Sequence, residues 1–247
     1  MSASLDKQEI KRFQKTSNKW WDEQGPFKPL HKLNPTRLAY FKKQICDHFD
    51  RDENTANSYK GLSIIDVGCG GGLVCEPMAR LGGKVTGIDA DEQAIGVAKD
   101  HAKASRLKID YKSITAEELV AKKKQYDVVL ALEIIEHVKD QKTFVETICS
   151  LCKPGGLIIF STLNRNPKSF ALGIVAAEYI LRWLPKGTHN WKKFLKPSEL
   201  SKFVRESNAV PHDITGLVYN PLHNEFSLSK SDLDVNYFLT AKQPSKS

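Results

Sequence analysis

The strongest structural signal in this chain is the stretch Ile64-Ile65-Asp66-Val67-Gly68-Cys69-Gly70-Gly71-Gly72. An apolar run that suits a buried strand leads directly into a glycine-rich turn, and a helical pattern follows at 73–81. Glycine has no Cβ, so the backbone can turn tightly there and a ligand can approach it closely. The first turn of the next helix also offers unpaired N–H groups to an electron-rich ligand. The stretch therefore predicts a ligand-binding turn between a strand and a helix.

Around this turn, short apolar runs alternate with helical patterns from residue 62 onward. We expect strands at 62–67, 84–89, 109–113, 126–132, 157–163, 212–220 and 234–241. We expect helices near 73–81, 91–104, 115–123, 139–152 and 197–206. This alternation is typical of βαβ units with right-handed crossovers. It predicts an α/β fold, Rossmann-like, with a doubly wound and mostly parallel sheet of seven strands.

Two segments stand outside this alternation. Residues 1–60 predict an N-terminal helical arm or cap, with a polar amphipathic helix at 5–21 and a second helix at 36–49 that follows Pro35. Residues 61–247 then form the main domain. Within it, an insertion at about 165–196 separates the fifth strand from the last helix.

Composition sets broad limits. The 247 residues are 40% apolar and 27% charged, as in an ordinary soluble globular protein. The net charge of +8 points to an anionic partner, either nucleic acid or an anionic membrane surface, without choosing between them. Residues 1–10 lack the features of a signal or transit peptide, and no stretch reaches the ~20 apolar residues of a spanning helix.

The five cysteines do not suggest a disulfide framework, because their number is odd. A reducing compartment is the simpler interpretation. Cys149 and Cys152 form one CxxC pair in a helical pattern with no second pair to complete a metal site. We expect them to be buried apolar residues rather than metal ligands.

The glycine spacing distinguishes between two cofactors. A dinucleotide fold needs GxGxxG, but Leu73 stands where its third glycine would be. The GxGxG spacing and Asp66 before it favour S-adenosylmethionine over NAD. Asp89 ends the second strand, where a carboxylate can accept both ribose hydroxyls of an adenosine. The alternative role of Asp89 is the N-cap of the helix at 91–104.

Many short motifs follow one another along the chain in a fixed order. DVGCGGG (66–72), VTGID (85–89), EHV (136–138), CKPGG (152–156) and STLNRN (161–166) are shared broadly or partly by class I methyltransferases. The more distinctive segments are WWD (20–22), FKPLH (27–31), LNPTR (33–37), PKGTH (185–189), TGL-x-YNP (215–221) and DVNY (234–237). Together these motifs resemble the ubiquinone biosynthesis O-methyltransferase family, from about residue 9 to 240.

The resemblance implies an activity and a cofactor site. It implies O-methylation of a polyprenyl-hydroxyphenol and of demethylubiquinol, two related steps with S-adenosylmethionine as methyl donor. It also implies cofactor contacts at Arg37, Gly68, Asp89 and Leu132, to which the glycine turn adds Gly70. A guanidinium at Arg37 can bind the carboxylate of the methionyl part. Without the family, Arg37 would be interpreted as a surface residue of a helix.

Glu133, Glu136 and His137 follow the fourth strand, where ligand chemistry in such sheets takes place. The resemblance implies that these three bind a divalent cation, with Mg²⁺ suited to the oxygen donors. Such an ion would lower the pKa of a bound phenol. The alternative is a metal-free site in which His137 is the general base and Glu136 orients it.

The insertion suggests how a membrane-held substrate is reached. Residues 169–183 read SFALGIVAAEYILRW, too short to span a bilayer and flanked by basic residues and by Trp183 and Trp191. This pattern is typical of an interfacial helix on anionic lipid, and the alternative is a buried lid over the active site. We expect both roles, on the cytoplasmic face of a bacterial inner membrane or the matrix face of a mitochondrial one. Other proteins of ubiquinone biosynthesis are expected partners, and nucleic acid is not.

Three other functions fit parts of the pattern. The charge would suit an RNA methyltransferase, but no recognisable RNA-binding module or Asn-Pro-Pro-Tyr-like motif accompanies it. A NAD(P)-binding oxidoreductase is disfavoured by the glycine spacing. A non-catalytic binding module is disfavoured by the acidic cluster after the fourth strand.

Overall fold

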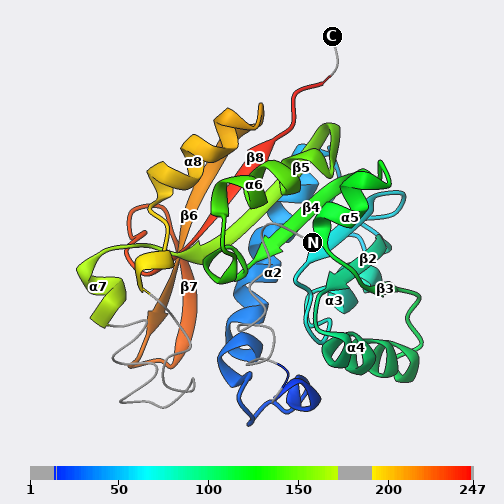
Figure 1. The fold of residues 1–247 in the computed structure, drawn as a ribbon. Helices are drawn as coiled ribbons and strands as arrows, with labels where there is room; N and C mark the ends of the chain where they lie inside the picture. Colours follow the sequence, from blue (N-terminus) through cyan, green and yellow to red (C-terminus); the bar gives the residue numbers. More distant parts are fainter. Residues whose placement is uncertain (1–13, 15, 172–190, 246–247) are drawn as a thin grey trace.

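The computed structural model describes residues 14, 16–171 and 191–245 (Figure 1). Its eight strands are β1 (Ser63–Val67), β2 (Lys84–Asp89), β3 (Asp110–Ser113), β4 (Tyr126–Leu132), β5 (Cys152–Leu163), β6 (Val210–Asn220), β7 (Glu225–Ser229) and β8 (Asn236–Lys242). They form one sheet in the order β3-β2-β1-β4-β5-β8-β6-β7. The strands from β3 to β5 pair in parallel, and β8, β6 and β7 continue the sheet antiparallel. The predicted doubly wound, mostly parallel α/β fold is confirmed.

The sheet has one strand more than the seven predicted. β7 pairs with β6 at the edge of the sheet, in a register that joins Tyr219 to Phe226. Its residues are exposed or half-buried, so the segment lacks the apolar run that marks the inner strands. Thr36 Oγ1 donates to the carbonyl oxygen of Phe226 at 3.0 Å. This strand therefore depends on β6 and on a helix that is remote in sequence.

Helices cover both faces of the sheet (Figure 1). The predicted helices are present as α3 (Cys75–Arg80), α4 (Glu92–Ala104), α5 (Ala116–Ala121), α6 (Gln141–Ser150) and α8 (Pro197–Glu206). Side chains fix their starts: Asp91 accepts from the N–H of Gln93, and Thr115 forms a capping box with Glu118. Asp91 rather than Asp89 therefore caps α4, which leaves the Asp89 side chain for another role.

Alternate residues of the inner strands supply two hydrophobic cores, because successive side chains of a strand point to opposite faces. Ile65 and Val129 belong to the core that also contains residues of α5, α6 and α8. Ile64 and Val128 belong to the core with residues of α3, α4 and α2 (Lys28–His48). Burial on both faces explains why these strands read as continuous apolar runs.

The second helix differs from its prediction. α2 begins at Lys28, and Pro35 lies inside it rather than at its start. Proline removes a backbone hydrogen bond and costs about 3 kcal/mol in a helix interior. Tertiary packing offsets this cost, because Phe41 and Ile45 are fully buried and the Tyr40 hydroxyl bonds to Thr240 at 2.7 Å. The predicted boundary at residue 60 remains a prediction, although α2 is part of a core.

β5 begins earlier than predicted. Cys152 is its first residue and so is not helical, while Cys149 lies in α6. The turn-like sequence 153–156 lies within the strand, where Gly155 has a φ of +75° and the pairing with β4 shifts register. All five cysteines are buried and free, which confirms the prediction that Cys149 and Cys152 are buried residues.

Two predicted segments fall largely outside the described residues. Of the N-terminal helix expected at 5–21, the structure describes a short 3-10 helix, η1 (Ser17–Lys19). Of the insertion, it describes α7 (Pro167–Ser169) and the 3-10 turn η4 (Trp191–Lys193), whereas the apolar stretch at 172–183 is not described. Among the described residues, no helix is long and apolar enough to cross a membrane.

Candidate active site

The candidate site lies where the winding of the sheet reverses, between β1 and β4. The two strands are parallel neighbours, with Val67 opposite Ala131. Helices that follow them leave toward opposite faces, so their carboxyl ends border a crevice in folds of this kind. The glycine turn follows β1, and Glu133 follows β4. Predicted residues that are some 60 positions apart in sequence are therefore brought to one edge.

The glycine turn needs its glycines for two separate reasons. Gly68, Gly70 and Gly72 have positive φ values of 76°, 50° and 87°, which L-residues rarely adopt. The turn is also closely covered: a Cβ at Gly70 would overlap the ring of Trp20, and one at Gly72 would overlap the hydroxyl of Tyr111. Sequence reasoning foresaw the tight turn but not this contact with the N-terminal arm.

Two tryptophans of the arm pack on the glycine turn. Trp21 Nε1 donates to the carbonyl oxygen of Gly71 at 2.9 Å, and its ring stacks on His101 of α4 with 3.4 Å between ring centroids. The Trp20 ring stacks on Phe27 at 3.8 Å. These contacts place the arm directly beside the predicted cofactor loop.

Asp89 is tied to the glycine turn. Its Oδ2 accepts from the N–H of Gly70 at 2.9 Å, and its Oδ1 accepts from the N–H of Asp91 at 2.8 Å. Burial raises the pKa of this carboxyl, which the two backbone donors partly counteract. A carboxylate held in this way at the end of β2 suits two ribose hydroxyls. Leu132, the last residue of β4, is 8% exposed beside this edge, and its cofactor contact remains a prediction.

Arg37 is buried, so its interpretation as a surface residue is wrong. It is 5% exposed, and its Nε donates to Asn34 Oδ1 at 2.7 Å. Burial lowers the pKa of Arg37 to about 10, although the charges of Asp66 and Glu133 oppose that shift. Burial likewise raises the pKa of Asp66 to about 6, and Arg37 counteracts it. A guanidinium from α2 therefore lies among carboxylates from β1 and the end of β4.

The structure brings Glu133 and Glu136 together. Glu133 has a φ of 50°, an uncommon conformation for a residue with a Cβ, and its N–H donates to the carbonyl oxygen of Ser161 at 3.0 Å. Glu136 is 3% exposed and accepts from Thr162 Oγ1 at 2.8 Å. Burial, followed by the charge of Glu133, raises the pKa of Glu136 to about 8. Two carboxyl groups this close favour one shared proton at neutral pH.

His137 ends the 3-10 turn η2 (Ile135–His137), and its N–H donates to the carbonyl oxygen of Ile134 at 2.9 Å. Across the described ranges, no group of three or more His, Cys, Asp or Glu side chains is arranged to hold a metal ion. The two glutamates are therefore together here, while His137 does not complete a set of three with them.

Sequence reasoning missed the polar side chains that hold the glutamates. Ser161 Oγ donates to Glu133 Oε1 at 2.6 Å, and Asn236 Nδ2 donates to the same oxygen at 3.0 Å. Thr162 Oγ1 donates a hydrogen bond to Glu136 in the same way. The signal was present, since Ser161 and Thr162 end a predicted strand and Asn236 lies in the DVNY segment. Ser161 and Asn236 reach the same glutamate because β5 and β8 pair in antiparallel register, which the sequence does not show.

The sheet order and the glycine turn define the class of protein: a class I methyltransferase. A family model described as "Methyltransferase domain" matches residues 35–211. Solved structures agree on the fold. A magnesium protoporphyrin IX methyltransferase from Synechocystis with bound SAH has a TM-score of 0.59 at 19% identity, covering 83% of this chain and 82% of that one. A Burkholderia thailandensis N-methyltransferase has a TM-score of 0.59 at 14% identity, covering 95% and 87%.

Curated relatives narrow the class to one family. A ubiquinone biosynthesis O-methyltransferase of Dinoroseobacter shibae is 50% identical over 243 residues, 98% of each chain. One from Bartonella bacilliformis is 51% identical over 241 residues, 98% of this chain and 97% of that one. The chain belongs to the ubiquinone biosynthesis O-methyltransferase family and is an S-adenosylmethionine-dependent O-methyltransferase. This membership sets aside the RNA methyltransferase, the NAD(P) oxidoreductase and the non-catalytic module.

Replacing Gly70 with alanine should weaken both the cofactor loop and the packing of the arm. The Cβ would overlap Trp20 at a backbone φ of 50°, so we expect a loss of about 1–3 kcal/mol in stability. Calorimetry with S-adenosylhomocysteine should show at least roughly tenfold weaker binding. Gly96→Ala is the control, because nothing lies within 4 Å of its Cβ in α4 and alanine favours a helix. Equal affinity of the two variants would contradict this account of the turn.

Asp66 should make stability depend on pH. The pKa of Asp66 is about 6 in the folded state, above the unfolded value of 3.8. The contribution of the protonated carboxyl group to the free energy of unfolding is therefore complete below pH 4 and is lost as the pH rises through 6. The shift corresponds to roughly 3 kcal/mol at most. Urea unfolding of Asp66→Asn and of the parent chain should therefore diverge between pH 4 and 7 in favour of the variant. A difference in unfolding free energy that is constant across this range would contradict the assignment.

Proposed function

We propose that the chain methylates a phenolic hydroxyl of polyprenylated precursors of ubiquinone, both a 2-polyprenyl-6-hydroxyphenol and 3-demethylubiquinol. The observation that carries this proposal is the pair Glu133 and Glu136, buried together beside the edge where the glycine turn and Asp89 lie. A phenol is a poor nucleophile until it loses its proton. Carboxylates next to the methyl donor are suited to accepting that proton.

In the proposed mechanism, Gly68, Gly70 and Asp89 hold the adenosine, and Arg37 binds the carboxylate of the methionyl part. The phenol oxygen would have to align with the methyl–sulfur bond, and such alignment would supply much of the rate. Glu133, Glu136 and His137 form the proton-accepting set. The proton leaves the hydroxyl, the oxygen forms the new bond to the methyl carbon, and the carbon–sulfur bond breaks with its electron pair moving to sulfur.

A divalent cation, Mg²⁺ by preference, fits part of this set. Glu136 Oε1 is buried and has no hydrogen-bond partner within the described part of the chain, and oxygen is the ligand that Mg²⁺ prefers. Glu133, Glu136 and His137 would hold the ion. When bound, it would lower the pKa of the phenol and of these carboxyl groups. Because the described residues contain no three-residue cluster of this kind, His137 would have to approach the glutamates.

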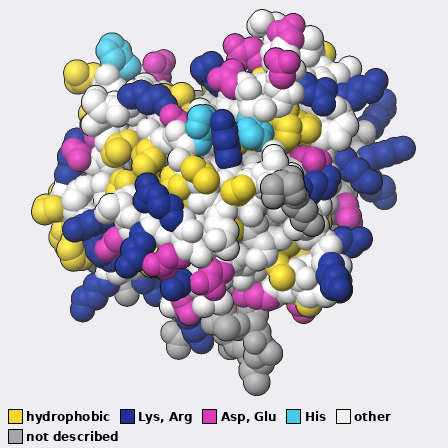
Figure 2. Space-filling model, turned by 90° about the horizontal axis from the view of Figure 1, so that it is seen from above, with side chains coloured by type: hydrophobic (Ala, Val, Ile, Leu, Met, Phe, Trp, Pro, Cys, Tyr) yellow, Lys and Arg dark blue, Asp and Glu magenta, His cyan; other side chains and the backbone are white. Residues whose placement is uncertain are grey.

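We further propose that the chain works at an anionic membrane surface, where such substrates reside. The net charge of +8 and the apolar insertion with basic flanks support this. Figure 2 shows basic side chains spread among acidic and apolar ones over one face, without the continuous basic stripe expected for nucleic acid. The place would be the cytoplasmic face of a bacterial inner membrane or the matrix face of a mitochondrial one. Other proteins of the pathway are proposed partners there.

Glu136→Gln tests the chemistry. Glutamine keeps the size of the side chain and can accept from Thr162, but it cannot carry negative charge. We expect turnover of a short-chain demethylubiquinol to fall roughly 10²–10⁴-fold, with S-adenosylmethionine affinity within about twofold. Assays with and without a chelator test the cation. The control is Glu146→Gln, an exposed carboxylate of α6. Full activity of Glu136→Gln would remove Glu136 from the mechanism, and turnover unaffected by a chelator would remove the cation.

Flotation with liposomes tests the membrane proposal. We expect the chain to float with vesicles that contain an anionic phospholipid and to stay below with purely zwitterionic ones, because basic flanks need negative lipid. Charge reversal at Lys192 and Lys193, which the 3-10 turn η4 places at the end of the insertion, should reduce flotation. The same reversal at Lys123 and Lys124 after α5 is the control. Equal flotation with both lipids would contradict the electrostatic part.

A further inference from the structure

Asn236 lies at the centre of the polar cluster around the glutamates. It is the first residue of β8 and pairs with Leu163, the last residue of β5. Its Nδ2 donates to Glu133 Oε1 at 3.0 Å, and Ser161 Oγ donates to that same oxygen. An ionised carboxylate has no proton to donate and can only accept hydrogen bonds. The amide nitrogen of Asn236 must therefore face Glu133, and the amide oxygen must face elsewhere. One side chain therefore presents a donor to Glu133, and its amide oxygen is directed away from that carboxylate.

One acceptor of this cluster lacks a donor. Glu136 Oε1 and Asn236 Oδ1 are both buried, and neither has a hydrogen-bond partner among the residues that the structure describes. The proton that Glu133 and Glu136 share can lie on Glu136 Oε1, whereas an amide oxygen can only accept a hydrogen bond. A buried acceptor without a donor is costly and uncommon in folded proteins. Asn236, which contacts Glu133, is thus short of a donor at its Oδ1, and a ring with two neighbouring hydroxyls brings O–H donors.

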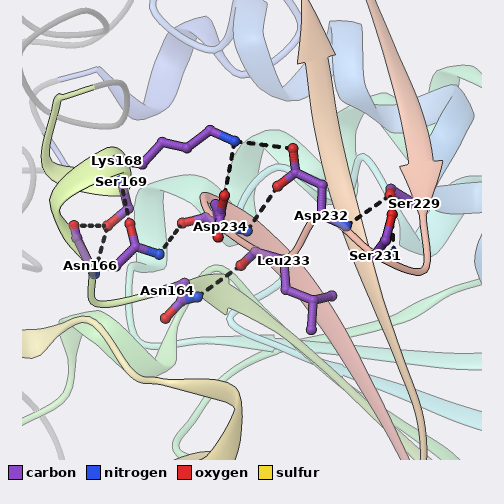
Figure 3. Close-up of polar contacts among 9 residues, drawn as sticks. All are labelled: Asn164, Asn166, Lys168, Ser169, Ser229, Ser231, Asp232, Leu233 and Asp234. Atoms are coloured by element: carbon purple, nitrogen blue, oxygen red, sulfur yellow. Dashed lines mark hydrogen bonds and ion pairs between the residues drawn. The ribbon is translucent and has the colours of Figure 1, made fainter.

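The segment before Asn236 is held by polar contacts with residues that follow β5, which Figure 3 shows for Asp232 to Asp234. Asn164 donates from its N–H to the carbonyl oxygen of Val235 at 2.8 Å and from its Nδ2 to that of Leu233 at 2.9 Å. Lys168 of α7 contacts Asp232 at 3.1 Å and Asp234 at 3.0 Å. The start of the insertion is therefore bound to the loop that delivers Asn236.

We propose that Asn236 is a positioning residue that decides which of two neighbouring hydroxyls receives the methyl group. This inference rests on the proposed function. Asn236 holds Glu133 through its Nδ2 and accepts the hydrogen bond of the hydroxyl that stays unmethylated through its Oδ1. The other hydroxyl is thereby left to the proton-accepting set. With two neighbouring oxygens that differ only in their surroundings, a fixed acceptor on one side is the simplest way to select between them.

The test uses a short-chain 2-hydroxy-6-prenylphenol, whose two hydroxyls are inequivalent, and measures the ratio of the two methylated isomers. Asn236→Ala removes both the donor and the acceptor. Asn236→Asp keeps the shape and one acceptor but places a third carboxyl group against Glu133. For both variants we expect the isomer ratio to fall by at least roughly fivefold. Binding of the same phenol to the S-adenosylhomocysteine complex, measured by calorimetry with Mg²⁺ present, should weaken by roughly five- to twentyfold.

Thr240→Val is the matched control. Thr240 lies on the same strand and on the same face as Asn236, about 13 Å away, and its buried hydroxyl bonds to Tyr40. Its loss should lower thermal stability while the isomer ratio and the binding of the phenol stay unchanged. A purely structural role of Asn236 would make its variants behave like this control.

The outcomes separate the two proposals. Folded Asn236→Ala and Asn236→Asp proteins that retain S-adenosylhomocysteine affinity, the parent isomer ratio and the parent phenol affinity would overturn the role of Asn236 alone. A parent enzyme that methylates neither hydroxyl of the phenol, nor the demethylubiquinol, would overturn the proposed function and this inference with it.

Discussion

The arrangement on which the rest of the structure depends is the parallel pairing of β1 with β4 at the point where the winding reverses. Crossover helices leave these strands toward opposite faces, so no helix crosses between their carboxyl ends. The glycine turn and Glu133 emerge there side by side, and β2 adds Asp89 from the next position. The candidate site residues come together because their strands end at this one edge.

Burial makes the charged forms of several side chains at this edge energetically costly. Asp66, Asp89 and Glu136 are carboxyl groups whose pKa values burial raises, and Arg37 is a buried cation among them. S-adenosylmethionine carries a sulfonium and an ammonium group in addition to its carboxylate. Its positive charges suit the acidic edge, and its carboxylate suits Arg37. Buried ionisable groups with shifted pKa values cluster at sites for charged ligands, as they do at this edge.

Segments outside the core sheet complete the site from two sides. The N-terminal arm packs Trp20 and Trp21 on the glycine turn, and the glycines are required as much by this contact as by their backbone conformation. On the other side, the start of the insertion is bound to the loop before β8 by Lys168 and two asparagines (Figure 3). The arm therefore contacts the glycine turn that is proposed to bind the cofactor, and the start of the insertion is connected to the loop before Asn236.

The sequence predicted seven of the eight strands, the five helices that alternate with them, the glycine turn and the candidate acidic residues, because these depend on local periodicity and on residues that are adjacent in the chain. It could not find β7, whose polar residues form a strand only against β6 and α2, nor the place of Pro35 inside a helix that tertiary packing stabilises. It left Arg37 open between surface and site, and only the packing of α2 buries that side chain. The contact of Asn236 with Glu133 spans 103 positions and arises from the antiparallel register of β5 and β8, which no local pattern specifies.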